Sequence, residues 1–136
     1  MSQTPTVPAL DLMQRYLAAA QRGDWSTGFG FFAEDIVIHI PGRSRFAGTH
    51  RGRDAAKRYI DSALAAHDGK VEVDLVDMLA SRDRVALIVD ERFHRDDGIV
   101  EIRRANVYRI RGQEIAEIWI FEANQYEADA LFADAP

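Results

Sequence analysis

The sequence contains no cysteine and no apolar run approaching the length of a membrane span. The first absence excludes thiol nucleophiles, thiolate metal sites and disulfide bridges, and it agrees with a reducing compartment. A span requires roughly 20 apolar residues, and the N-terminal MSQTPTVPALD has no basic segment followed by an apolar one. We therefore expect a cytoplasmic protein without a membrane partner.

Positive charge is also scarce, because 17 Lys and Arg face 22 Asp and Glu, for a formal net charge of −5. Such a balance repels nucleic acid, so no nucleic-acid partner is expected. A chain of 136 residues with 47% hydrophobic residues is long enough to bury a core without disulfides or a structural metal. We expect one domain over residues 1–136.

Several motifs that carry chemistry are missing. The sequence has no phosphate-cradling glycine-rich loop, no GxSxG nucleophile elbow and no dinucleotide fingerprint. Its histidines, His39, His50, His67 and His94, do not follow a metal-ligand spacing. The sequence therefore predicts neither a metal site nor a cofactor.

Helical patterns dominate the first half of the chain. Apolar residues recur at spacings of three and four between Leu10 and Ala20, which predicts an amphipathic helix ending at Gly23. Asp24 is placed to cap a second, short helix. Residues 36–40 are β-branched and bounded by a Pro-Gly turn, so they predict a strand, and a third helix is expected over residues 52–65.

The second half changes to strand patterns separated by turn signals. Strands are expected at residues 71–79, 85–94, 99–111 and 114–123, with a short terminal helix at residues 125–132. Helices followed by a meander of strands predict an α+β fold, in which a curved antiparallel sheet wraps around three N-terminal helices.

Strand alternation predicts a pocket wall, because residues two apart on a strand line the same face. Asn106 and Tyr108 share a face of the strand at residues 99–111. By the same rule Glu117, Trp119 and Phe121 share a face of the last strand. An aromatic wall with few polar groups is typical of small-molecule sites. The alternative is that these are core residues, and for Trp119 and Phe121 taken alone core packing is the favoured explanation.

Three stretches of the chain carry a family resemblance: QRYLAAAQRGDW, FFAEDIVIHIPGRSRFAGTHRGRD and residues 104–121. Together they resemble the SnoaL-like and ketosteroid-isomerase-like branch of the nuclear transport factor 2-like superfamily. The resemblance implies a cone-shaped, cystatin-like α+β barrel and a homodimer. It also places Tyr16 at that family's oxyanion-binding tyrosine and Asn106 at its protonated aspartic acid, and an asparagine amide can also donate a hydrogen bond.

The acids that the family uses are missing at two positions. Ile40 stands at the catalytic aspartate of ketosteroid isomerases, and Phe121 stands at the last-strand aspartate of SnoaL-like cyclases. His39, in HIPG, is the nearest replacement, since a histidine titrates near neutral pH. It is either a pocket acid or base or a core histidine, because a register error of one residue reverses the face. Glu117 would pair with an arginine, Arg104 or Arg92, or act as a buried acid.

The sequence thus favours a protein that binds a small hydrophobic or aromatic molecule bearing a carbonyl or hydroxyl group. One hypothesis is a cofactor-independent isomerase, cyclase, hydratase or hydrolase that works by proton transfer. The alternative is a non-catalytic ligand-binding or protein-association domain. The expected catalytic residues are His39, Tyr16 and Asn106, and the expected ligand-binding residues are Trp25, Phe29, Phe46, Tyr108, Glu117, Trp119 and Phe121.

Overall fold

The computed structural model describes residues 8–65 and 70–133, so His67 lies outside the described residues. The elements in chain order are α1 (Pro8–Gln21), α2 (Trp25–Phe29), β1 (Phe32–Ile40), β2 (Gly48–Arg51), α3 (Arg53–Ala65), β3 (Val71–Ala80), β4 (Arg84–Arg95), β5 (Gly98–Arg111), β6 (Glu114–Glu122) and α4 (Gln125–Ala133). The α+β class predicted from the sequence is confirmed. None of the helices in these ranges combines the length and apolar character that crossing a membrane requires.

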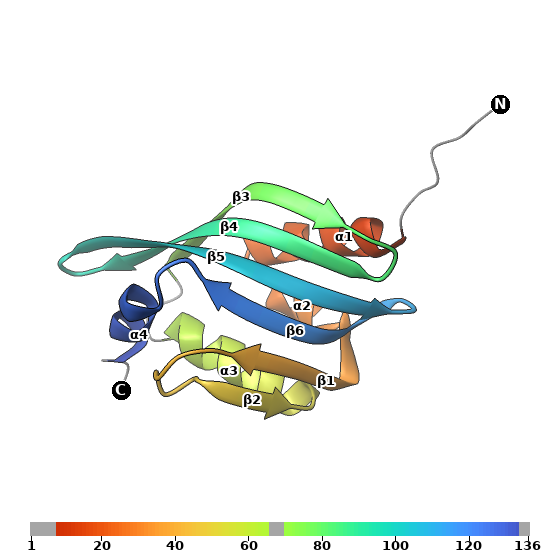
Figure 1. Cartoon of the computed structure of the whole chain (residues 1–136), viewed down its shortest axis with the longest axis horizontal. Helices are drawn as coiled ribbons and strands as arrows, with labels where there is room; N and C mark the ends of the chain where they lie inside the picture. Colours follow the sequence, from red (N-terminus) through yellow and green to blue (C-terminus); the bar gives the residue numbers. More distant parts are fainter. Residues whose placement is uncertain (1–7, 66–69, 134–136) are drawn as a thin grey trace.

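The strands form one curved, open sheet in the order β2-β1-β6-β5-β4-β3 (Figure 1). Strands β3 to β6 are the antiparallel meander that the turn signals predict. The sheet differs from the expected all-antiparallel one because β1 pairs with β6 in parallel, and the short strand β2 was not predicted. No hairpin joins β1 to β6, so no local turn dictates their relative direction.

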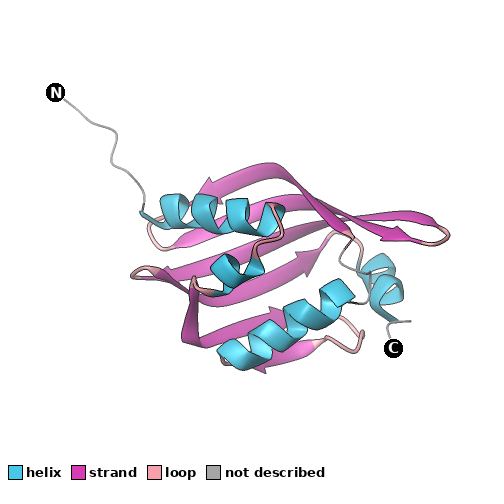
Figure 2. Cartoon of the chain, turned by 180° about the vertical axis from the view of Figure 1, so that it is seen from behind, coloured by secondary structure: helices cyan, strands magenta, loops and turns pink. Residues whose placement is uncertain are grey.

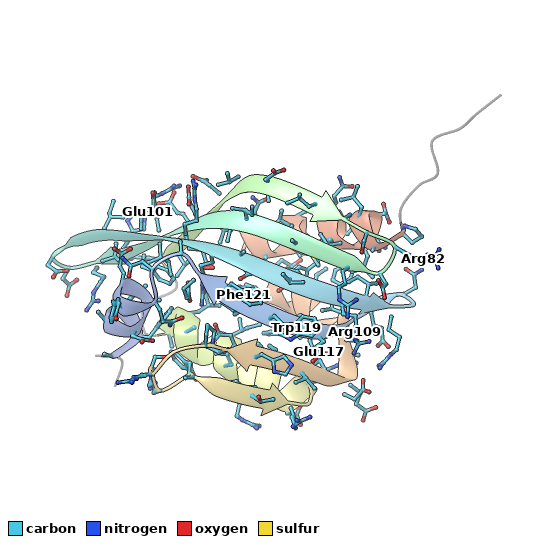
Figure 3. All side chains as sticks on the ribbon, viewed as in Figure 1. Arg82, Glu101, Arg109, Glu117, Trp119 and Phe121 are labelled. Atoms are coloured by element: carbon cyan, nitrogen blue, oxygen red, sulfur yellow. The ribbon has the colours of Figure 1, made fainter. Side chains whose placement is uncertain are left out.

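Helices α1, α2 and α3 cover one face of the sheet (Figure 2). We call this covered face the inner face, and its strand residues include Val85, Leu87 and Val89 of β4, all buried. The opposite face, the outer face, carries Arg109, Trp119 and Phe121 (Figure 3). The regular alternation of β4 between these two faces explains the period of two in its sequence.

The α2 helix is short, and it is stabilised by an N-terminal cap and by the packing of its tryptophan. Asp24 caps it by accepting a hydrogen bond from the backbone N–H of Thr27 at 3.2 Å, as the sequence predicts. A Cβ on Gly28 would lie 3.1 Å from the ring of Trp25. Glycine therefore permits the close approach between this helix and its own tryptophan, which in turn contacts Tyr16 of α1 edge-on at a centroid distance of 6.2 Å.

A β-bulge interrupts the alternation of β6. Arg109 pairs with Glu117, yet the next residue of β5, Ile110, pairs with Ile115, so Ala116 is an extra residue in β6. Both Ile115 and Ala116 are buried. A bulge of this kind shifts every later side chain of the strand by one face.

Candidate functional site

A cavity of about 510 Å³ lies between the inner face and the helices. Its wall is mainly apolar, with contributions from helices α1 to α4 and from the five strands β1 and β3 to β6. Representative lining residues are Leu17, Ile60, Val73, Leu87, Ile118 and Ile120. A volume of this size, enclosed mostly by aliphatic and aromatic side chains, is in the range of small-molecule sites.

The polar part of the cavity is built around Arg104, which is only 5% exposed. Its Nε and Nη2 donate to the carboxylate of Glu122, at 3.0 Å and 2.8 Å, and its Nη1 donates to Oε2 of Glu91 at 3.2 Å. Glu91 lines the main cavity, whereas Glu122 lines a small neighbouring one. One buried guanidinium is therefore held between two carboxylates.

Burial perturbs the protonation of this cluster. Desolvation raises the pKa of Glu122, against the opposing effect of Arg104. Desolvation acts to lower the pKa of Arg104, but the charges of Glu91 and Glu122 overcome it and raise the pKa. Arg104 accordingly stays charged in the interior, where it also lies over the ring of Phe132 at 5.7 Å.

Tyrosines and one asparagine complete the polar lining. Burial raises the pKa of the Tyr16 hydroxyl and that of Tyr108. A hydrogen bond from the Asn106 side chain partly opposes the rise at Tyr108. The Oδ1 atom of Asn106 is buried and has no hydrogen-bond partner among the described residues.

Four of the predicted site residues meet in this cavity. Tyr16, Trp25, Asn106 and Tyr108 all line it, although they come from α1, α2 and β5. The rings of Tyr16 and Tyr108 are 5.8 Å apart. The alternation of β5 was therefore interpreted correctly, and the roles assigned to these residues stay predictions.

His39 does not reach the cavity, contrary to the expected position. Its Nε2 lies 2.5 Å from Oε2 of Glu117, and its ring stacks on Trp119 with a centroid distance of 5.5 Å. The neighbour Ile38 lines the cavity instead. The isoleucines of β1 point inward because their burial gains more free energy than burial of an imidazole, and His39 then occupies the outer face by alternation.

Glu117, Trp119 and Phe121 are also on the outer face, so their placement in the pocket was wrong (Figure 3). The bulge at Ala116 is the reason. Strict alternation counted from Ile115 places all three residues on the inner face, and the extra residue moves them to the outer face. Phe121 is 52% exposed. Glu117 pairs with His39 and, at 3.3 Å, with Arg109 rather than with Arg104 or Arg92. The hydrogen bond from His39 is the main cause of its lowered pKa.

Phe29 and Phe46 lie away from the cavity as well. Phe29 packs against Trp25 and Phe32, with centroids 5.7 Å and 5.9 Å apart. Phe46 contacts Tyr59 at 5.4 Å, and it lines the small neighbouring cavity. Both rings support the walls of the site rather than forming its surface.

The sequence interpretation missed Glu91 and the pairing of Arg104. Glu91 follows Val85, Leu87 and Val89 in an apolar series with a period of two, and Phe93 continues it. A carboxylate at an inward position of such a series is a signal for a buried ion pair. Within residues 8–65 and 70–133, no three His, Asp or Glu side chains come together as metal ligands.

An open curved sheet with helices on its inner face is also found in solved structures. A Xanthomonas campestris protein with a cystatin-like fold superposes with a TM-score of 0.85 at 26% identity, covering 92% of this chain and 98% of its own. The Mycobacterium tuberculosis protein Rv0760c, solved in complex with estradiol-17β-hemisuccinate, has a TM-score of 0.72 at 23% identity, covering 85% of this chain and 94% of its own. The second likeness is one of fold.

The family follows from the sequence match. Residues 13–118 match the SnoaL-like domain family, and the chain belongs to this family. The uncharacterized protein Rv0034 of M. tuberculosis is 30% identical over 125 residues, which cover 91% of this chain and 95% of that protein. The resemblance inferred from the sequence is confirmed.

Proposed function

We propose that this protein binds a small, mainly apolar molecule in the cavity of about 510 Å³. The observation that carries the proposal is the composition of the wall, which is apolar except for a few convergent polar groups. Family membership supports it, since the SnoaL-like fold is compatible with small-molecule binding. Rv0760c, a protein of the same fold, was solved in complex with estradiol-17β-hemisuccinate, which supports small-molecule binding by this chain as well.

Filling the cavity tests the proposal. Ala63 of α3 lines the cavity, and its neighbour Ser62 is exposed. Ala63→Phe should abolish the binding of apolar probes in calorimetry and the co-purification of small molecules seen by native mass spectrometry, whereas Ser62→Phe should leave both unchanged. Equal binding by the two variants would refute the cavity as the binding site.

Proton-transfer catalysis is the second candidate function, and Glu91 is the observation that favours it. This carboxylate shares the cavity with Tyr16 and Asn106, so a general base and two groups that can hydrogen-bond to oxygen surround one space. In this proposal Glu91 takes the role first expected of His39. The reaction class remains a cofactor-independent isomerase, cyclase, hydratase or hydrolase.

Hydrogen exchange tests this candidate without knowledge of the substrate. A ketone that binds in the cavity is incubated in D₂O, and NMR follows exchange of the hydrogens next to its carbonyl. Glu91→Gln should slow protein-dependent exchange by about a hundredfold or more, while His39→Gln should leave it unchanged. Absence of any protein-dependent exchange favours the alternative of a non-catalytic binding or association domain.

A homodimer is the proposed assembly, with the outer face as its contact surface. Phe121 and Leu79 are large apolar residues exposed on that face, and exposed apolar area often marks an interface. Light scattering of the natural protein and of Phe121→Glu tests this, with a shift to the monomer mass expected in the variant. The cytoplasmic location stays a prediction from the sequence.

A further inference from the structure

Among the described residues, the buried cluster around Arg104 contains two carboxylates and one cation, because Glu122 and Glu91 both accept hydrogen bonds from the same guanidinium. Arg22 also lines the cavity, but it pairs with Asp24 at 3.2 Å. Each of these two arginines is therefore balanced by a carboxylate outside the wall of the main cavity, Asp24 or Glu122. The negative charge of Glu91 is left without a counter-charge of its own.

Glu91 is the more weakly held of the two carboxylates. Arg104 donates from Nε and Nη2 to Glu122 at 3.0 Å and 2.8 Å, whereas its Nη1 lies 3.2 Å and 3.4 Å from the carboxylate oxygens of Glu91. The side chain of Glu122 is 3% exposed, and that of Glu91 is 13% exposed. Since a carboxylate can accept about four hydrogen bonds, Glu91 has acceptor capacity left for a ligand.

The accessible part of Glu91 faces the cavity. This residue occupies an inner-face position of β4, where its cross-strand neighbours are Val73 and Ile102. Glu91 and Val73 both line the cavity, and Ile102 is buried beside them. Folding has thus already removed most of the water from this carboxylate, so its desolvation adds little cost when a cation binds.

Aromatic rings surround the same space. Trp25, Tyr16, Tyr59 and Tyr108 line the cavity, and a cation over the face of such a ring is attracted to it, most strongly for tryptophan. Burial is the main cause of the raised pKa of each tyrosine hydroxyl, and the charge of Glu91 adds to the rise in all three. The negative charge of Glu91 therefore acts on the space that these rings enclose.

We propose that the ligand is a hydrophobic amine whose ammonium group donates a hydrogen bond to the carboxylate of Glu91 and contacts the aromatic rings, while its apolar part fills the rest of the cavity. This inference deepens the proposed small-molecule function and rests on it. Recognition of an ammonium group requires only the charge of Glu91, so it is independent of the proposed proton transfer.

Three naphthalene probes test this proposal with the natural protein: 2-naphthylmethylamine, 2-naphthylmethanol and 2-naphthoate. They share one apolar frame, and near neutral pH the first is a cation, the second is neutral and the third is an anion. Calorimetry should show the amine binding about tenfold or more tightly than the alcohol, the ratio expected for one hydrogen bond between charged groups. The anionic 2-naphthoate should bind most weakly, because it faces Glu91.

Variants then connect the preference to Glu91. Glu91→Gln removes the charge at nearly constant size and leaves the pair of Arg104 with Glu122 balanced, so the advantage of the amine over the alcohol should fall to about one. Glu101→Gln makes the same change on the exposed side of β5 (Figure 3), where Glu101 pairs with Arg92 at 3.6 Å. This matched control should retain the full advantage. If Glu91→Gln does not fold, the comparison among the three probes still decides.

The outcomes separate the two levels of the proposal. If the alcohol binds as tightly as the amine, or 2-naphthoate binds most tightly, the amine preference is wrong while small-molecule binding stands. An advantage of the amine that survives in Glu91→Gln overturns the assignment to that residue. Amine binding that persists in Ala63→Phe would place the amine outside the cavity. Failure of all three probes to bind would overturn the proposed function and this inference together.

Discussion

The inner and outer faces of the sheet each carry an ion pair between an arginine and a carboxylate, but the two pairs differ in solvent exposure. On β5, Arg104 points inward between Glu91 and Glu122, and its side chain is 6% exposed. Its neighbour Arg103 points outward to Asp90 at 2.8 Å, and its side chain is 54% exposed. The contrast predicts that burial, more than geometry, decides what a charged contact contributes to folding, because water screens the outer pair and not the inner one.

The outer face also gathers residues whose chemistry suggested a site. His39, Glu117 and Arg109 form a hydrogen-bonded group around Trp119. Arg84 lies over the same indole ring at 5.8 Å. This group resembles a catalytic cluster in composition, but the sheet separates it from the cavity. Proximity of reactive residue types is therefore insufficient without a shared hollow.

The largest expected effect comes from removing the buried cation. Arg104→Met should lower the free energy of unfolding by about 3–5 kcal/mol, since it leaves two carboxylates near each other in the interior without a counter-charge. Urea denaturation of this variant and of the adjacent control, Arg103→Met, measures the difference between the faces. Similar losses in both variants would contradict the comparison.

An intermediate effect is expected when the pH changes. The contributions of an inner and an outer carboxylate to folding stability should change with pH in opposite directions. Burial raises the pKa of Glu122 above its usual 4.5, so its favourable contribution is complete below that value and is lost as the pH rises through the folded-state pKa. The hydrogen bond from Arg103 holds the pKa of Asp90 below 3.8, so its contribution is present above that value and is lost as the pH falls through the folded-state pKa.

The variants Glu122→Gln and Asp90→Asn test these opposite pH dependences of stability. Between neutral pH and the acid range, the natural protein should gain stability relative to Glu122→Gln as the pH falls, and it should lose stability relative to Asp90→Asn. Urea midpoints measured across that pH range give both trends. The same sign in both series would show that burial does not control the inner carboxylate.

A smaller effect is expected from the outer cluster. His39→Gln should cost less than about 1 kcal/mol in the free energy of unfolding, because the pair with Glu117 is partly exposed. Calorimetry should show the affinity of any cavity ligand unchanged within about twofold, a shift below the tenfold that one buried hydrogen bond contributes. A large loss of ligand affinity in a folded His39→Gln protein would show that His39 takes part in ligand binding.

The least perturbing comparison uses the two tryptophans as reporters. Trp25 lines the cavity and Trp119 lies on the outer face. Ligand addition should change the fluorescence of Trp119→Phe, in which Trp25 remains, and should leave that of Trp25→Phe nearly constant. A response that follows Trp119 instead would place the ligand on the outer face.

Local patterns in the sequence predicted most of the fold. Spacings of three and four indicated α1, the cap at Asp24 indicated α2, and turn signals delimited β3 to β6. Strand β2 was missed because its four residues have no apolar alternation and pair only with the edge of β1. The parallel pairing of β1 with β6 was missed because it joins segments far apart in the chain.

The candidate site was predicted where alternation is regular. Asn106 and Tyr108 lie on β5, whose pairing with β4 is uninterrupted, and both reach the cavity. Trp119 was assigned to the wrong face because the extra residue Ala116 leaves no distinct mark in an apolar sequence. His39 was ambiguous, since a short strand has two faces and only packing selects between them.

The amino-acid sequence alone determined the family, the type of every element except β2, and the apolar character of the interior, because these depend on periodicity and composition over short stretches. Tertiary structure alone decided which charges enter the interior, which side of the sheet His39 occupies, and that Glu91 and Arg104 meet beside Asn106. Those outcomes depend on strand register and on one bulge, which are selected by packing across the whole sheet.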